Sequence, residues 1–64
     1  MKEQLKFLRD SANLTQAEVA KSLGFRASTV SMWETGKRNP SISKLPEIAR
    51  LFNCTIDELF KETA

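Results

Sequence analysis

The chain has 64 residues, of which 41% are hydrophobic and 28% charged, with a net charge of +2. This length and balance are typical of a single small globular domain, which we expect to span residues 1–64. No apolar run approaches the roughly 20 residues that cross a bilayer, and the N-terminus does not have the pattern of a secretory signal. We therefore expect a cytoplasmic protein without membrane contact.

Residue types that commonly carry catalysis or bind metals are scarce. The chain has one cysteine, Cys54, and no histidine. An internal disulfide or a cysteine–histidine zinc site is thereby excluded, and the commonest general base is missing. The sequence also has no glycine-rich phosphate loop and no tight acidic cluster. We expect no enzymatic activity, no cofactor and no metal site.

Positive charge is concentrated in the middle of the chain. Residues 21–44 hold five cations against one carboxylate, Glu34, whereas residues 45–64 hold two cations against four carboxylates. This asymmetry suggests a polyanionic partner for the middle segment, although a solvated basic face would have the same composition.

Helical spacing and end signals define the first two predicted helices. Apolar residues three and four apart predict a helix over residues 2–12; they are Leu5, Leu8 and Ala12. Asn13 follows, a residue that tolerates the left-handed conformation found after many helices. Thr15 with Glu18 forms a capping box, in which each side chain satisfies a free backbone amide. It opens a second helix, which Gly24 ends.

The next two helices follow from similar signals. Residues 27–34 should form a helix with Val30 and Trp33 buried, ended by Gly36 and followed by a basic loop. Ser43 is expected to cap a fourth helix that carries Pro46 in its first turn, where a missing amide costs little. The expected inward residues of this helix are Leu45, Ile48, Ala49 and Phe52.

The last helix opens with a second capping box, Thr55 with Glu58. Its apolar residues are Ile56, Leu59 and Phe60. Because no segment has the alternating pattern of a strand, the whole sequence predicts an all-α fold of five helices.

The second and third predicted helices, joined by about three residues, match a helix-turn-helix motif. Ala20 provides a small side chain where the two helices cross, and Val30 packs under the crossing. Gly24 can adopt the positive φ that a sharp turn requires.

The chain resembles the phage Cro and repressor family (xenobiotic-response-element type) of helix-turn-helix proteins. The resemblance lies in Leu14-Thr15-Gln16-Ala17-Glu18-Val19-Ala20, Leu23-Gly24, Ser28-Thr29-Val30-Ser31, Trp33-Glu34 and Gly36-Lys37-Arg38-Asn39-Pro40. It continues through Ile48-Ala49 and Asn53-Cys54-Thr55-Ile56-Asp57-Glu58-Leu59-Phe60, without gaps. It implies a compact five-helix, lambda-repressor-like DNA-binding domain whose helix-turn-helix is formed by helices 2 and 3.

The function implied by this resemblance is that of a sequence-specific transcriptional regulator of double-stranded DNA. The simplest form is a repressor that binds a pseudo-palindromic operator as a homodimer, with its third helix in the major groove. The resemblance also implies a bacterial or phage-encoded protein associated with the nucleoid.

The resemblance implies two sets of DNA contacts. The expected base-reading residues are Arg26, Ala27, Ser28, Ser31 and Met32. The expected phosphate-binding residues are Gln16, Thr29, Thr35, Lys37 and Arg38. For both sets, an ordinary solvated surface is the alternative interpretation; Met32 could also be partly buried, and the hydroxyl of Thr29 could be structural.

Two positions depart from the family pattern. Where the family often has a serine or threonine cap before the third helix, this chain has Arg26, and where a long polar base reader often follows, it has Ala27. A missing cap costs about 1 kcal/mol. We therefore hypothesise that Arg26 contacts a guanine or a nearby phosphate instead.

Other residues are expected to be structural or to form protein interfaces. The resemblance implies a buried Arg9–Glu34 pair, and we interpret Trp33 as core and Cys54 as a small buried apolar residue. The resemblance also implies a dimer interface near the last two helices, for which the candidates are Asn53, Cys54, Ile56 and Phe60.

A second interpretation is a protein-docking module that binds a regulatory protein partner through Phe7 and the acidic C-terminal third. RNA binding is disfavoured, because the aromatic residues are not arranged for stacking on bases.

Overall fold

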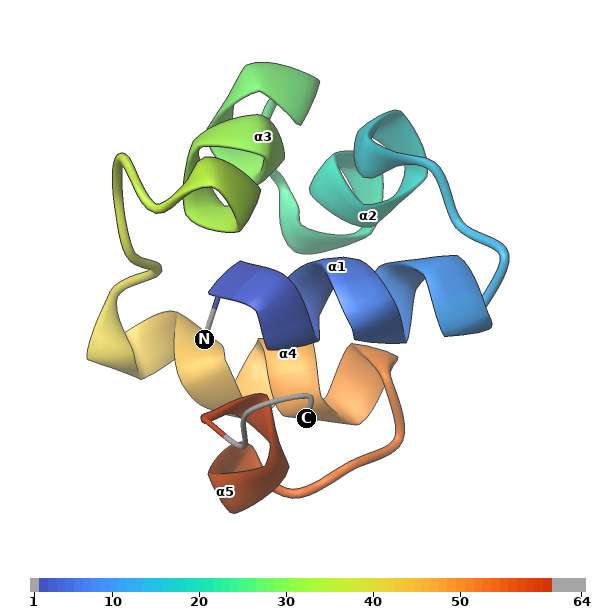
Figure 1. The fold of residues 1–64 in the computed structure, drawn as a ribbon, viewed down its shortest axis with the longest axis vertical. Helices are drawn as coiled ribbons and strands as arrows, with labels where there is room; N and C mark the ends of the chain where they lie inside the picture. Colours follow the sequence, from blue (N-terminus) through green and yellow to red (C-terminus); the bar gives the residue numbers. More distant parts are fainter. Residues whose placement is uncertain (1, 61–64) are drawn as a thin grey trace.

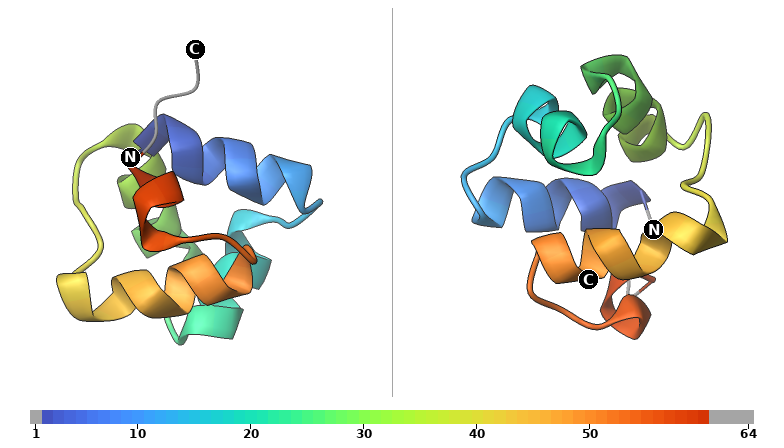
Figure 2. Two further views of the ribbon diagram at one scale, coloured as in Figure 1. Left: turned by 90° about the horizontal axis from the view of Figure 1, so that it is seen from below. Right: turned by 180° about the vertical axis from the view of Figure 1, so that it is seen from behind.

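The computed structural model describes residues 2–60, and within them the chain is helical and contains no strand. Its elements are α1 (Lys2–Ser11), α2 (Gln16–Leu23), α3 (Ala27–Thr35), the short 3-10 helix η1 (Ile42–Lys44), α4 (Leu45–Leu51) and α5 (Ile56–Leu59). α1 packs against α3 and α5, and α4 packs against α2 and α5. Figure 1 and the rear view in Figure 2 show the α2–α3 pair at one end of the molecule and α5 at the other. The predicted all-α fold is confirmed.

One hydrophobic core joins all five α-helices. Its buried members are Leu5, Val19, Ala20, Val30, Trp33, Leu45, Ile48, Ala49 and Leu59. Ala20 is 1% exposed and Val30 3% exposed, as expected for residues at the crossing of two helices. Because α1 and α4 contribute to this core, they support the α2–α3 pair on the side that faces α5.

Both predicted capping boxes are present. The Thr15 hydroxyl oxygen accepts from the Glu18 backbone N–H at 3.1 Å, and the Thr15 N–H donates to the Glu18 carboxylate at 2.9 Å. The N–H of Thr15 thereby lowers the pKa of Glu18. Thr55 and Glu58 form the same pair of bonds at the start of α5, at 3.2 and 3.3 Å.

The ends of α1, α2, α3 and α4 share one geometry. Each is followed by a residue of positive φ, namely Asn13, Gly24, Gly36 and Asn53. At each end the next backbone N–H bonds five residues back, as Phe25 does to the Ala20 carbonyl at 2.8 Å. This double-bonded ending, the Schellman motif, satisfies carbonyls that the helix leaves unpaired.

Some local expectations were wrong. Ala12 lies beyond the end of α1 and is exposed. Ser43 does not cap α4, because it lies inside η1 and its hydroxyl pairs with that of Ser41 at 3.1 Å. The preceding 3-10 turn leads directly into α4, so Lys44 occupies the N-cap position without a side-chain bond, while Pro46 does lie in the first turn.

The remaining apolar side chains differ in how deeply they are buried. Ile56 is 40% and Phe60 52% exposed, so Leu59 alone anchors α5 in the core. Phe52 lies just past α4 and is half-buried. Cys54 is half-buried rather than fully buried, although it packs against the core.

Candidate nucleic-acid interface

The turn between α2 and α3 bends sharply at Gly24. Gly24 has φ +81°, and its N–H and that of Phe25 bond back to the last turn of α2. An ideal Cβ at Gly24 would meet nothing within 4 Å, so the glycine is required for its dihedral angles rather than for space. The bend places α2 and α3 against each other as a helix-turn-helix (Figure 1).

Arg26 is the N-cap residue of α3 and has an extended backbone with no side-chain capping bond. Its side chain is exposed. The first amides of α3 therefore receive no side-chain partner from the N-cap residue, as the sequence predicted from the missing serine or threonine. The guanidinium at this end of the helix is free to reach an external acceptor.

The face of α3 opposite Val30 and Trp33 carries the predicted base-reading residues. Ser28 is exposed, whereas Ala27, Ser31 and Met32 are half-buried. Together with Arg26 they occupy the first two turns of the helix, the part that a recognition helix presents to bases. Thr29 is half-buried at the edge of this face.

The end of α3 differs from the other Schellman endings. The residue after the positive-φ position is Leu14, Phe25 or Cys54 in three of them, and each packs against the core. At the end of α3 the corresponding residue is Lys37, which is exposed, as is Arg38 beside it. A position that elsewhere anchors the chain to the core is therefore occupied by a cation facing outward.

Thr35 completes this group, although its hydroxyl has a partner. Its Oγ1 donates to the Met32 carbonyl at 3.3 Å. A contact from Thr35 to an anion would require this hydroxyl to rotate, because a carbonyl and a phosphate oxygen both accept.

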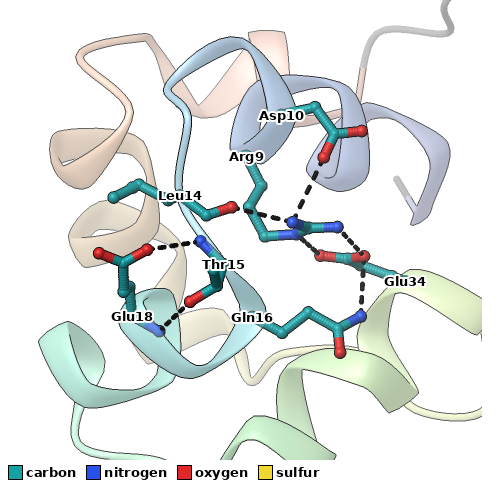
Figure 3. A network of polar contacts seen from close by, with 7 residues as sticks. All are labelled: Arg9, Asp10, Leu14, Thr15, Gln16, Glu18 and Glu34. Atoms are coloured by element: carbon teal, nitrogen blue, oxygen red, sulfur yellow. Dashed lines mark hydrogen bonds and ion pairs between the residues drawn. The ribbon is translucent and has the colours of Figure 1, made fainter.

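Arg9 and Glu34 form the predicted buried pair. Arg9 Nε lies 2.6 Å from Glu34 Oε2, and their side chains are 13% and 5% exposed. Arg9 also donates to the Leu14 carbonyl at 2.9 Å, which fixes the chain just before α2 (Figure 3). The hydrogen bonds that Arg9 donates to Glu34 raise the pKa of Arg9, so the guanidinium stays charged.

Gln16 joins this pair. Its Nε2 donates to Glu34 Oε1 at 3.1 Å, so the first residue of α2 is bonded to the penultimate residue of α3. Figure 3 shows the three side chains meeting from three helices. The sequence placed Gln16 among the phosphate-binding residues but did not predict this bond.

Two further residues near the turn were missed. Phe25 packs edge-on against Trp33, with ring centroids 5.3 Å apart, and Lys44 Nζ lies 5.4 Å from the Phe25 ring centroid. These contacts tie the turn to η1 and stabilise it. An aromatic residue directly after a positive-φ glycine is the signal that could have indicated the docking of Phe25.

The four dimer candidates lie along the turn before α5 and on α5 itself. Asn53, Ile56 and Phe60 are exposed, and Cys54 is half-buried. Ile56 and Phe60 are four residues apart, so they lie on one face of this helix end. Burial raises the pKa of the Cys54 thiol, which makes it a poor nucleophile.

Within residues 2–60, acidic and sulfur side chains do not gather into a group that could hold a metal ion. In the same part of the chain, every helix is too short or too polar to cross a membrane.

A helix-turn-helix family profile matches residues 5–59. An uncharacterised helix-turn-helix transcriptional regulator of Archaeoglobus fulgidus is 42% identical over 60 residues, which are 94% of this chain and 84% of that protein. The transcriptional activator BcrR of Enterococcus faecalis is 42% identical over 57 residues, 89% of this chain but 28% of its own length. The repressor RstR of the cryptic phage CTXphi, from Vibrio cholerae, is 34% identical over 59 residues, 92% of this chain and 53% of that protein.

Solved structures share the fold. The P22 c2 repressor, crystallised with a synthetic operator, has a TM-score of 0.85 at 24% identity, over 91% of this chain and 88% of its own. Hydroxypropylphosphonic acid epoxidase from S. wedmorenis has a TM-score of 0.84 at 30% identity, over 91% of this chain but 31% of the enzyme. That match covers only a small part of the enzyme, whereas the relative from Archaeoglobus fulgidus, matched over most of its length, is named as a transcriptional regulator. The chain belongs to the Cro/repressor-like helix-turn-helix family of transcriptional regulators.

Proposed function

We propose that this chain, acting as one domain over residues 1–64, is a sequence-specific repressor of transcription that binds double-stranded DNA. In this proposal α3 enters the major groove. The observation that carries it is the outward face of α3, which has the small polar residues Ser28 and Ser31 between a free arginine at one end and two exposed cations at the other. Small polar and apolar side chains can approach base edges closely, and flanking cations can hold the phosphates.

Each group of residues has a defined role. Arg26 contacts a guanine edge through its paired N–H donors, and Met32 and Ala27 pack on thymine methyl groups. Ser28 and Ser31 donate to or accept from bases. The phosphate contacts come from Gln16, Thr29, Thr35, Lys37 and Arg38, which fix the position of the domain on the duplex.

The proposed working form is a homodimer on a pseudo-palindromic operator. The structure extends over 27 × 24 × 21 Å, so one copy spans only a short length of duplex. Half-sites about 34 Å apart would place two copies on the same side of the DNA. Exposed Ile56 and Phe60, with Asn53 and Cys54, supply the contact between copies, since apolar side chains this exposed gain free energy when covered.

Repression is favoured over activation by the relatives. RstR is a repressor, and so is the c2 protein of P22, whose structure this chain resembles. The activator BcrR matches over only 28% of its length, so its name describes a protein most of which lies outside the match. A bound domain that occupies a promoter is sufficient to block it, and such a protein acts in the cytoplasm.

The competing function is that of a protein-docking module. Phe7 is 54% exposed, which a partner protein could cover. The five cations against one carboxylate in residues 21–44 favour DNA, because a pure docking domain does not need them.

Selection of binding sites from random duplexes, followed by titration at two salt concentrations, tests the proposal. A palindromic consensus bound by two copies, as measured by sedimentation, is the expected result. Equal affinity for every duplex would indicate a nonspecific binder. Loss of all binding at physiological salt, together with tight capture of one protein, would favour the docking module.

A further inference from the structure

Glu34 is unusual among the charged residues of the helix-turn-helix. It is the one carboxylate between residues 21 and 44, and its side chain is 5% exposed although it lies beside the proposed DNA-binding surface. A carboxylate close to phosphates would weaken binding by repulsion. Its position therefore calls for a function that outweighs this cost.

Both oxygens of Glu34 accept hydrogen bonds. Oε2 accepts from Arg9 Nε at 2.6 Å. Oε1 accepts from Arg9 Nη2 and from Gln16 Nε2, each at 3.1 Å. The fork of Arg9 neutralises the carboxylate and fixes its plane, because paired bonds of this kind define the geometry as well as the charge (Figure 3).

This arrangement determines how the amide of Gln16 is oriented. A carboxylate can only accept, so it must face the NH2 group of the glutamine and not the carbonyl. One N–H is then bonded to Glu34, and the second remains available. Gln16 is also the first residue of α2, where the backbone amides lack helical partners.

We propose that Glu34 is a positioning residue for DNA binding: it holds the Gln16 amide so that the second N–H donates to a phosphate at the start of α2. This rests on the phosphate role proposed above for Gln16. Gln16 is held before DNA arrives, so less side-chain freedom is lost on binding than for a free glutamine. Arg9 supports the proposed phosphate contact in two ways. It fixes the Glu34 carboxylate, and it also donates to the Leu14 carbonyl just before α2.

A double-mutant cycle tests the proposal with the selected duplex. Gln16→Ala should lower affinity about tenfold, the value of one hydrogen bond to a charged group. Glu34→Gln should lower affinity about threefold in the wild-type background, because the new amide no longer imposes the orientation of Gln16. In the Gln16→Ala background, Glu34→Gln should leave affinity unchanged or raise it slightly, since no Gln16 amide remains for Glu34 to position.

Glu3→Gln is the matched control, because it makes the same chemical change at an exposed carboxylate on α1. It should have the same effect in both backgrounds. If Glu34→Gln also lowers affinity by the same factor in both, Glu34 is only structural and the inference is wrong while DNA binding stands. If the wild-type chain has no preferred duplex, the proposed function itself fails.

A measurement on the wild-type chain avoids any variant that fails to fold. In the free protein, one of the two side-chain amide proton resonances of Gln16 in an NMR spectrum should be shifted, by the bond to Glu34, away from its position in an exposed glutamine. Addition of the duplex should shift mainly the other. Two protons that behave like those of an exposed glutamine would overturn the inference.

Discussion

At the scale of single residues, Arg26 combines a structural cost with a proposed gain. It occupies the N-cap position of α3 without a capping bond, whereas serine there would stabilise the domain by about 1 kcal/mol. Selection for stability alone would favour a capping residue. The exposed guanidinium at the N-terminal end of α3 is therefore consistent with the recognition role proposed for it.

Substitution of Arg26 can separate these two effects. Arg26→Ser should raise the free energy of unfolding by about 1 kcal/mol and lower affinity for the selected duplex by about tenfold. Arg26→Ala should lower affinity similarly without stabilising the domain. Both variants should lose the preference for guanine at one operator position, measured by titrating duplexes with each base there. Unchanged affinity and base preference in both would rule out base reading by Arg26.

Cys54 should make the stability of the domain depend on pH in the alkaline range. Burial is the main cause of its raised pKa, and the charge of Glu58 adds to it. The unfolded thiol therefore loses its proton at a lower pH than the folded one. The protonated thiol therefore stabilises the folded state below the ordinary pKa of 9.0. This contribution is lost as the pH rises from 9.0 to the raised pKa of the folded thiol.

Urea unfolding at several pH values between neutral and alkaline tests this effect. The free energy of unfolding of the wild-type chain should fall more steeply with pH in that interval than that of Cys54→Ala. Other titrating groups are common to both proteins and cancel in the comparison. Parallel curves for the two proteins would show that burial of Cys54 does not perturb its titration.

At the scale of elements, the helix ends were the most predictable features. Thr15 and Thr55 with glutamates three residues later, and Gly24 as a stop signal, each rest on backbone groups within a few residues, so the sequence contains all that decides them. The predicted cap of α4 was wrong because the hydroxyl of Ser43 pairs with that of Ser41, the residue before η1, rather than with a helix amide. That outcome depends on how the preceding loop packs.

The candidate site was only partly predictable from the sequence. Which residues of α3 face outward follows from its period once Val30 and Trp33 are known to be buried. The bond between Gln16 and Glu34 joins residues 18 positions apart and depends on how α2 crosses α3. Contacts of this kind, like that of Lys44 with Phe25, are decided by tertiary packing and have no local signal.

The turn between α2 and α3 allows a test at the level of backbone conformation. Gly24→Ala should destabilise the domain by about 1–2 kcal/mol, because alanine is strained at φ +81° although space is available for its methyl group. Gly24→Asn should cost less, since asparagine tolerates this region and is found at the ends of α1 and α4. Thermal unfolding measures both. Equal losses for the two variants would indicate a steric cause instead.

At the scale of the whole molecule, charge is separated along the fold. The helix-turn-helix and the loop after it carry the excess of cations, while the C-terminal third carries the excess of carboxylates. A domain with this polarity would be oriented by the field of DNA before contact. The Arg9–Glu34 pair contributes by neutralising the one carboxylate between residues 21 and 44.

This polarity predicts a salt dependence that can be assigned to particular residues. Each phosphate contact releases counterions, so the slope of log affinity against log salt concentration changes by about 0.9 per contact. Removing Lys37 and Arg38 together, as Lys37→Gln with Arg38→Gln, should therefore reduce the slope by about 1.8 per protomer. The loss should be similar on specific and nonspecific duplexes, because phosphates carry no sequence information.

The control for this measurement is Lys21→Gln with Arg50→Gln, which removes two exposed cations outside the proposed interface. It changes the net charge of the chain by the same amount as the paired change at Lys37 and Arg38. If contacts rather than net charge decide the salt dependence, the control should leave the slope nearly unchanged, since charges away from the duplex are screened within about 10 Å at 0.1 M salt. Equal changes in slope for the two double variants would instead mean that DNA binding depends on the net charge of the chain and not on defined phosphate contacts at the end of α3.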